Sequence, residues 1–254
     1  MEKGGVFPFP SRRFISLATE QVFYFLETNR REKKRTEEKK LFSTTSFLSF
    51  SFLSFSTHTG LVSSVIMLAA VESGNVKEFA ELMRQNPGFD VNMDHSDGRG
   101  NTLLHFACEG DSSSPVIPLL LAHPDIDVNV KTKYGSTPFL FACFGRPSCV
   151  RELLKDSRVK VNEPTKDGCT PLWRAAYYSH LDIVKCWIAS GREIDLGKPG
   201  DVDKTDAIGG AKKKGETEVV TLLERFKSDP AKTRSEVRKE LGITGQCCSF
   251  FSID

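Results

Sequence analysis

Apolar residues recur at helical spacing in two short runs within residues 168–195, and a polar turn separates the runs. Leu172, Ala175 and Ala176 lie three to four residues apart, so they share one face of a first helix. A second run has the same spacing and contains Leu181, Val184, Trp187 and Ile188. The pattern predicts two amphipathic helices joined by a tight turn. A unit this small cannot bury its apolar face alone, so it needs neighbours built in the same way.

The ends of these two helices also have sequence signals. Thr170 is a favourable N-cap, and Pro171 then falls at the first helical position, where its missing N–H costs nothing. Gly191 suits the C-cap of the second helix. Gly168 suits a preceding turn that needs a positive φ.

The same opening occurs again upstream, at Gly100–Cys108 and Tyr134–Cys143. Weaker copies lie near residues 68–75 and 210–215. The alignable alanines are Ala70, Ala107, Ala142, Ala175 and Ala211, at spacings of 37, 35, 33 and 36 residues. The units end alike, in Asp90-Val91-Asn92, Asp127-Val128-Asn129, Lys160-Val161-Asn162 and Glu193-Ile194-Asp195.

A period near 33 residues, with a Thr-Pro-Leu-His-x-Ala opening and a terminal Asp-Val-Asn, resembles the ankyrin repeat. The resemblance covers roughly residues 64–227. It implies an all-α fold, an ankyrin-type α-solenoid of helix-turn-helix repeats with short β-hairpin loops. It also implies that Thr102 and His105 tie adjacent loops together, and that a protein partner binds the concave face.

Individual units depart from the family pattern. The turn at 111–115 is one residue longer than usual, and Pro118 falls near the start of the next helix, which should therefore begin late or bend. Leu140 and Trp173 replace the family histidine. Ser179 replaces the usual turn glycine, so that turn should be slightly strained.

The chain is expected to divide into residues 1–62, 63–227 and 228–254. The first part holds a charged run at 30–40 and a Phe/Ser-rich run at 42–56, and we expect it either to be disordered or not to belong to the functional protein. The charged run could be a nuclear-localisation patch, but its interspersed glutamates favour a solvated helix. The last part should be a short helix followed by an irregular tail.

Composition limits the chemistry. The formal net charge is +2, so bulk electrostatics does not point to nucleic acid. The 7 cysteines include no Cys-x-x-Cys pair, and Cys108 and Cys143 occupy small-residue core positions, so we expect buried thiols in an intracellular protein, cytoplasmic or nuclear. The Phe/Ser-rich run is too short and too polar for a membrane span.

No catalytic motif stands out. The sequence lacks Gly-x-Ser-x-Gly, His-Glu-x-x-His and a glycine-rich phosphate cradle. We therefore expect a non-catalytic scaffold that binds an unidentified protein, with no cofactor, metal site or small-molecule substrate. The alternative is a regulatory chain, or a fragment of a larger protein, whose effector region lies outside the repeats.

The resemblance selects the side chains that should contact the partner, at hairpin tips and after the paired small residues of the first helices. Aromatic residues beside Arg or Lys are also the usual composition of binding hot spots. The predicted residues are Arg99, Asn101, Glu109, Lys133, Tyr134, Ser136, Phe144, Lys166, Asp167, Cys169, Trp173, Tyr177 and Tyr178. We expect Tyr177 and Tyr178 to pack against nothing within their repeat, whereas Trp173 could equally belong to the core.

Asn129 is a candidate for asparagine hydroxylation. Leu121 lies eight residues before it, and Asp127-Val128 immediately precede it, as in many modified ankyrin-repeat asparagines. The alternative, which we favour, is that Asn129 simply ties its loop together.

Overall fold

The computed structural model describes residues 59–95, 98–197 and 205–243. These lie within one compact unit, His58–Asp254. The predictions for residues 1–58, for the tail from 244 and for most of the loop at 197–204 fall outside the described residues.

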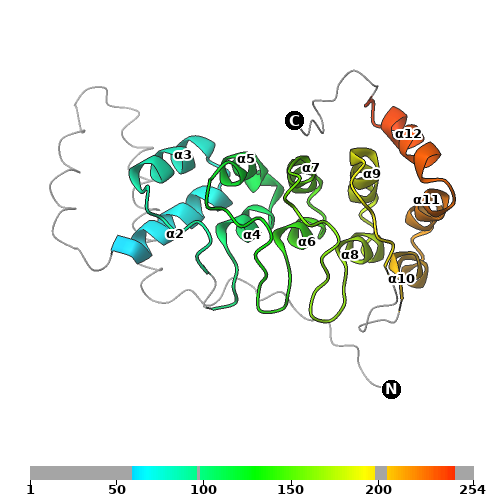
Figure 1. Ribbon diagram of the computed structural model, residues 1–254, viewed down its shortest axis with the longest axis horizontal. Helices are drawn as coiled ribbons and strands as arrows, with labels where there is room; N and C mark the ends of the chain where they lie inside the picture. Colours follow the sequence, from blue (N-terminus) through cyan, green and yellow to red (C-terminus); the bar gives the residue numbers. More distant parts are fainter. Residues whose placement is uncertain (1–58, 96–97, 198–204, 244–254) are drawn as a thin grey trace, which may run out of the picture. The chain divides into compact units, whose positions relative to one another are not determined.

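The described residues form helix pairs in series. The first four pairs comprise α2 (Thr59–Glu72) with α3 (Val76–Gln85), α4 (Leu103–Ala107) with η1 (Asp111–Val116) and α5 (Ile117–Leu121), α6 (Pro138–Ala142) with α7 (Pro147–Lys155), and α8 (Pro171–Tyr177) with α9 (Leu181–Ser190). The chain then forms α10 (Ala207–Lys214), α11 (Thr217–Ser228) and α12 (Pro230–Glu240). In Figure 1, α4, α6 and α8 form one row, α5, α7 and α9 form another, and the long loops extend from the first row.

The helices begin where the threonines predict. The hydroxyl oxygen of Thr170 accepts from the backbone N–H of Trp173 at 3.2 Å, and Thr137 does the same for Leu140 at 3.2 Å. Each threonine precedes a proline at the first helical position. Asp206 caps α10 in the same manner. These side chains satisfy backbone donors that have no partner inside the helix.

Close packing between units depends on the aligned alanines. All of them are buried. Ala70 has 2% of its surface exposed, and Ala107, Ala142, Ala175 and Ala211 have none. The helix α8 packs against α6 on one side and α10 on the other. A side chain without atoms beyond Cβ allows the backbones of successive first helices to approach closely.

Both helices of a unit supply large side chains to the core. Trp187 of α9 is fully buried and meets Phe139 of α6 edge to face, with ring centroids 4.9 Å apart. Its indole N–H donates to the Glu193 carbonyl at 3.2 Å, so the buried polar atom has a partner. Val150, Leu153 and Leu154 of α7 are also fully buried, as their spacing predicts.

Two predicted irregularities are confirmed. The long turn after α4 becomes the 3₁₀ helix η1, and α5 starts only at Ile117, with Pro118 in its first turn. Ser179 has φ 61°, and it is the only non-glycine residue at positive φ among the described residues. Its hydroxyl donates to the carboxylate of Glu216 in the next unit.

The loops pair through isolated backbone hydrogen bonds. Lys133 N donates to Arg99 O at 2.8 Å, and Lys166 N donates to Tyr134 O at 3.1 Å. Each of these hairpins is therefore hydrogen-bonded to the one before it. Within a hairpin, Thr132 N donates to Ser136 O at 3.0 Å. These hydrogen bonds are isolated rather than consecutive, so the described part of the chain forms no strands.

His105 connects two units, as the resemblance implied. One ring nitrogen lies 3.0 Å from the Thr102 hydroxyl, and the other lies 3.2 Å from the Ser136 carbonyl oxygen of the next hairpin. Burial lowers the pKa of His105 to about 4. The imidazole is therefore neutral at neutral pH and acts as a structural bridge.

Helix α12 packs against α9 and α11. Val237 and Thr233 bury their side chains there. The guanidinium of Arg238 donates to the Ala189 carbonyl at 2.7 Å, and that of Arg234 donates to the Ile188 carbonyl at 3.2 Å. Both carbonyls lie in the last turn of α9, and that of Ile188 also accepts from the C-cap Gly191 N–H at 3.4 Å, so α12 adds donors to the end of α9.

Replacing Ala175 with Leu should lower the free energy of unfolding by roughly 1–3 kcal/mol, because the larger side chain overpacks the space between α8 and its neighbours. Urea unfolding followed by circular dichroism measures the change. The control is Ala231→Leu on the exposed side of α12, which should stay within about 0.5 kcal/mol of wild type. Equal effects of the two changes would contradict this account of the packing.

His105 should make folding sensitive to acid. Its pKa is about 4 in the folded chain against 6.5 for an unperturbed histidine, so the unfolded chain binds this proton more readily. The stabilisation is fully present above pH 6.5 and is lost as the pH falls toward 4, by roughly 2–4 kcal/mol. The matched control is His105→Leu, which copies Leu140 of the next unit. The pH dependence of unfolding should be steeper in wild type than in His105→Leu; parallel curves would refute the assignment.

Candidate protein-binding surface

An aromatic cluster lies where the first helices of the third and fourth units end. It consists of Phe144, which follows α6, Trp173 and Tyr177 of α8, and Tyr178 at the C-cap of α8. Trp173 and Tyr177 stack, with ring centroids 4.5 Å apart and an interplanar angle of 18°. Tyr178 meets Tyr177 edge to face at 5.2 Å and lies 6.2 Å from Phe144. The repeat period therefore brings these four predicted residues together.

Two cations complete the cluster. The guanidinium carbon of Arg174 lies 4.2 Å from the Phe144 ring centroid and 5.8 Å from that of Tyr178. Lys214, the last residue of α10, places its ammonium 4.7 Å from the Tyr177 ring centroid. These distances are typical of cation–π contacts. We call the four rings and these two cations the aromatic–cation cluster.

The cluster corrects one expectation. Tyr177 and Tyr178 do not stand apart from their surroundings, because each contacts another ring and a cation. Tyr177 is half-buried by these contacts, whereas Tyr178 remains 48% exposed. The prediction was wrong because Trp173 and Arg174 each lie four residues before a tyrosine in the same stretch, the spacing at which helix side chains meet, and Lys214 of the next unit adds a further contact.

Trp173 is neither fully buried in the core nor fully exposed. It is half-buried, and its indole N–H donates to the Thr205 hydroxyl at 3.1 Å. A Cβ on Gly210 would lie 2.8 Å from the same indole nitrogen, so α10 approaches the ring where it has no side chain. Trp173 thus connects the fourth and fifth units, and its ring also stacks on that of Tyr177.

The predicted hairpin-tip residues divide into two groups. Arg99, Lys133, Tyr134, Lys166 and Asp167 are exposed, and Tyr134 has 66% of its surface accessible. These side chains can reach a partner.

The remaining predicted residues serve the fold in part. Cys169 is buried and its N–H donates to the Thr165 hydroxyl at 3.1 Å, so it lies inside its hairpin rather than at the tip. Ser136 and Asn101 are half-buried, and their carbonyls accept from His105 and His95. Glu109 is exposed, but its carbonyl accepts from the Arg146 guanidinium at 2.6 Å.

Arg174 and Lys214 were missed by the sequence reasoning. Arg174 lies four residues before Tyr178, the spacing at which helix side chains meet, and this was the available signal. Lys214 had no local signal, because its contact with Tyr177 crosses from one unit to the next.

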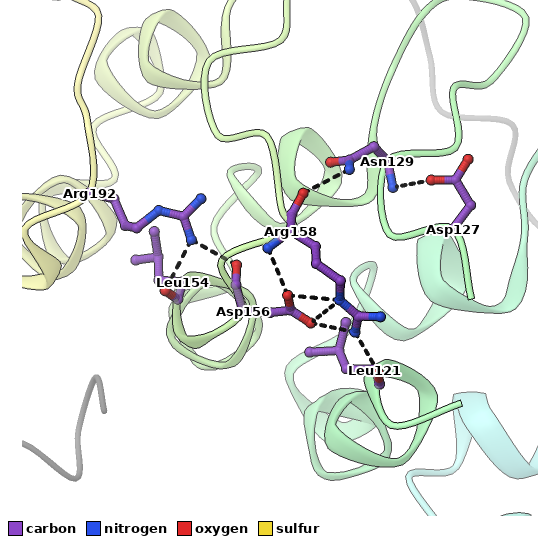
Figure 2. A network of polar contacts seen from close by, with 7 residues as sticks. All are labelled: Leu121, Asp127, Asn129, Leu154, Asp156, Arg158 and Arg192. Carbon is purple, nitrogen blue, oxygen red and sulfur yellow. Dashed lines mark hydrogen bonds and ion pairs between the residues drawn. The ribbon is translucent and has the colours of Figure 1, made fainter. Parts of the chain in front are cut away.

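Asn129 ties two loops together. Its side-chain amide donates to the Arg158 carbonyl at 2.9 Å, and its side-chain oxygen accepts from Lys160 N at 2.7 Å. Figure 2 shows the first of these bonds and the bond from Asn129 N to the Asp127 carboxylate, at 2.9 Å. Asn92 and Asn162 make equivalent bonds in the units on either side. Hydroxylation of Asn129 stays a prediction.

Two arginines near these asparagines donate hydrogen bonds to backbone carbonyls at the ends of second helices. Arg158 donates to the Leu121 carbonyl at 2.6 Å and pairs with Asp156, also at 2.6 Å (Figure 2). Arg192 donates to the Asp156 carbonyl at 2.7 Å and the Leu154 carbonyl at 3.5 Å. Each guanidinium reaches back one unit to backbone oxygens at the end of a second helix.

The cysteines of the repeats are free and buried. Burial raises the pKa of Cys149 to about 12 and raises that of Cys108 and Cys143 as well. Such thiols stay protonated and unreactive. In the part of the chain that the structure covers, no group of three or more His, Cys, Asp or Glu could hold a metal ion, and no helix is long and apolar enough to cross a membrane.

Replacing Asn129 with Ala should lower the free energy of unfolding by about 1–3 kcal/mol, because two interloop hydrogen bonds are lost. The equivalent bonds of Asn162 are longer, at 3.4 and 3.2 Å, so Asn162→Ala should cost less. Thermal or urea unfolding of both variants measures the difference. A larger loss from Asn162→Ala would contradict the ranking by geometry.

Comparisons with known proteins agree with this geometry. A family model described as ankyrin repeats (3 copies) matches residues 66–165 and 113–199. The chain is 36% identical over 107 residues to SMC5-SMC6 complex localization factor protein 1 of Homo sapiens, which covers 42% of this chain and 10% of that protein. It is 30% identical over 95 residues to a putative ankyrin repeat protein of Rickettsia bellii, covering 37% of this chain and 52% of that one.

A shorter match is to ankyrin repeat domain-containing protein 49 of Homo sapiens, 47% identical over 49 residues, 19% of this chain and 20% of that protein. The chain thus spans about a tenth of the length of the SMC5-SMC6 relative and about half of the Rickettsia one. The family matches together extend from residue 66 to residue 199, more than half of the 254 residues. On this evidence and on its stacked helix pairs, the chain belongs to the ankyrin repeat family.

Proposed function

We propose that this chain is a non-catalytic scaffold that holds a protein partner on its concave face, across the hairpin tips and the ends of the first helices. Ankyrin repeats are protein-interaction modules, and that coarse role follows from the family. The partner's location on this face is the proposal.

The exposed rings of this face carry the proposal. The exposed large hydrophobic residues of the described chain are Leu119, Tyr134, Tyr178 and Leu241. The two tyrosines both belong to the predicted surface, and Tyr178 is part of the aromatic–cation cluster. Tyrosine beside arginine is the composition of binding hot spots, because a rigid ring buries much area for little loss of rotamer freedom.

The chemistry of the buried groups supports a binding role. His105 uses both ring nitrogens in structural contacts, and the buried cysteines are held as neutral thiols. Free buried thiols are also typical of a reducing compartment, which supports the proposed intracellular location.

A second candidate is a regulatory chain or a fragment whose effector region lies outside the repeats. The observation that favours it is the small share of its relatives that the chain matches, 10% of the human SMC5-SMC6 factor and 16% of the mouse serine/threonine-protein kinase TNNI3K. Capture of partners with the full chain and with residues 59–243 separates the two candidates. Partners retained only by the full chain would favour an effector region outside the repeats.

Replacing Tyr134 and Tyr178 together with Ala should weaken partner binding by roughly 2 kcal/mol or more, about thirtyfold in affinity, while unfolding stays within about 1 kcal/mol of wild type. Tyr177 is left intact because it stacks on Trp173. Immobilised wild-type and variant chains are used to capture proteins from extract, and recovery is quantified by mass spectrometry.

The matched control is Leu119→Ala, which removes an exposed apolar side chain from α5, a second helix of the stack. It should leave recovery unchanged. If the double tyrosine variant folds normally and recovers the same proteins in the same amounts, the binding surface lies elsewhere.

A further inference from the structure

Arg174 and Lys214 are held by rings, and no carboxylate pairs with either of them among the described residues. Several other cations have acidic partners, as Lys131 pairs with Glu163 at 2.5 Å and Lys185 pairs with Glu240 at 2.5 Å. Arg174 instead lies over Phe144 and beside Tyr178, and Lys214 lies over Tyr177. The aromatic–cation cluster therefore carries two positive charges that the described part of the chain does not neutralise.

The Arg174 side chain also has an unsatisfied donor. Its Nε is buried and lacks a hydrogen-bond partner among the described residues. A buried N–H without an acceptor costs free energy, and the chain itself covers it, so a partner meets the terminal N–H groups of the same guanidinium. The guanidinium is fixed over a ring, so it loses little freedom when its N–H groups meet a planar acceptor. A carboxylate fits that fork with two parallel hydrogen bonds.

The surrounding charges favour an acidic partner. The exposed tips of successive hairpins present Arg99, Lys133 and Lys166. Among the described residues of these hairpins and helix ends, the acidic groups include Asp167, Glu109 and Glu163, which pairs with Lys131, together with Glu216, whose carboxylate accepts from Ser179. The cations of the tips and the cluster thus belong to successive units along one face. A carboxylate-bearing chain lying along this face meets attraction at each unit.

We propose that the aromatic–cation cluster binds an acidic linear peptide segment of the partner, with a Glu or Asp carboxylate on Arg174 and Lys214 and an adjacent apolar side chain against Tyr178 and Phe144. This inference rests on the proposed function and specifies the partner's chemistry. A peptide fits better than a nucleic acid, because the formal net charge is only +2 and the acidic side chains Glu109 and Asp167 interrupt the basic positions.

The test uses three fluorescein-labelled peptides that share their aromatic positions and carry glutamate, glutamine or lysine between them. Binding to the full-length chain is measured by fluorescence anisotropy. The glutamate peptide should bind at least about tenfold more tightly than the glutamine peptide, and added salt should weaken it. Arg174→Met, which keeps the apolar stem, should weaken it at least about tenfold, and Lys214→Met by a smaller factor.

The matched control is Lys239→Met, which removes an exposed cation from α12 and should change the affinity by less than about twofold. Thermal unfolding checks each variant. Lys214 is exposed at the end of α10, so its variant keeps the test decisive if Arg174→Met fails to fold.

The outcomes separate this inference from the proposed function. Equal binding of the glutamate and glutamine peptides, or no binding of the glutamate peptide, overturns the acidic-peptide inference. In either case, loss of captured partners in the tyrosine variant would still support the concave face. Unchanged capture by the tyrosine variant overturns the proposed function itself. Displacement of the glutamate peptide by a single-stranded RNA oligonucleotide that binds more tightly would assign the cluster to nucleic acid and overturn the inference.

Discussion

The close approach of successive first helices is the constraint on which the other features depend. A helix pair of this size has too little apolar surface to fold alone, so each unit must bury itself against the next. The buried alanines, from Ala70 to Ala211, make that approach possible. Core side chains such as Trp187 then pack between the two rows of helices.

The same repetition explains the polar contacts. Each unit leaves backbone carbonyls free at the end of its second helix and a loop that cannot stand alone. Arg158 and Arg192 satisfy carbonyls of the preceding unit, whereas Asn129 bonds to the loop of the following one. These contacts join neighbouring units, and α12 supplies Arg234 and Arg238 for α9. Stability is distributed along the stack as a series of nearest-neighbour terms.

The candidate surface follows from the same repeat geometry. The positions after the paired small residues leave the core, so they are free to carry large rings. Here Phe144, Tyr177 and Tyr178 occupy them, and cations from α8 and α10 lie against the rings. Trp173 stacks on Tyr177 and bonds to Thr205, so two units hold the cluster in place. A preorganised surface of this kind loses little entropy on binding, which suits a scaffold.

The sequence by itself determined the family, the helix starts at Thr137 and Thr170, the late start of α5 and the positive φ of Ser179, because each depends on residues close together in the chain. It also predicted that Phe144 and Tyr178 occupy equivalent positions of neighbouring units, and their ring centroids lie 6.2 Å apart. Only the tertiary structure decided that Cys169 turns inward, that Trp173 bonds to Thr205 of the next unit, and that Lys214 joins the cluster. These contacts join side chains of different units or depend on how a hairpin folds back, and their geometry depends on the packing of α8 against α10 rather than on any local pattern.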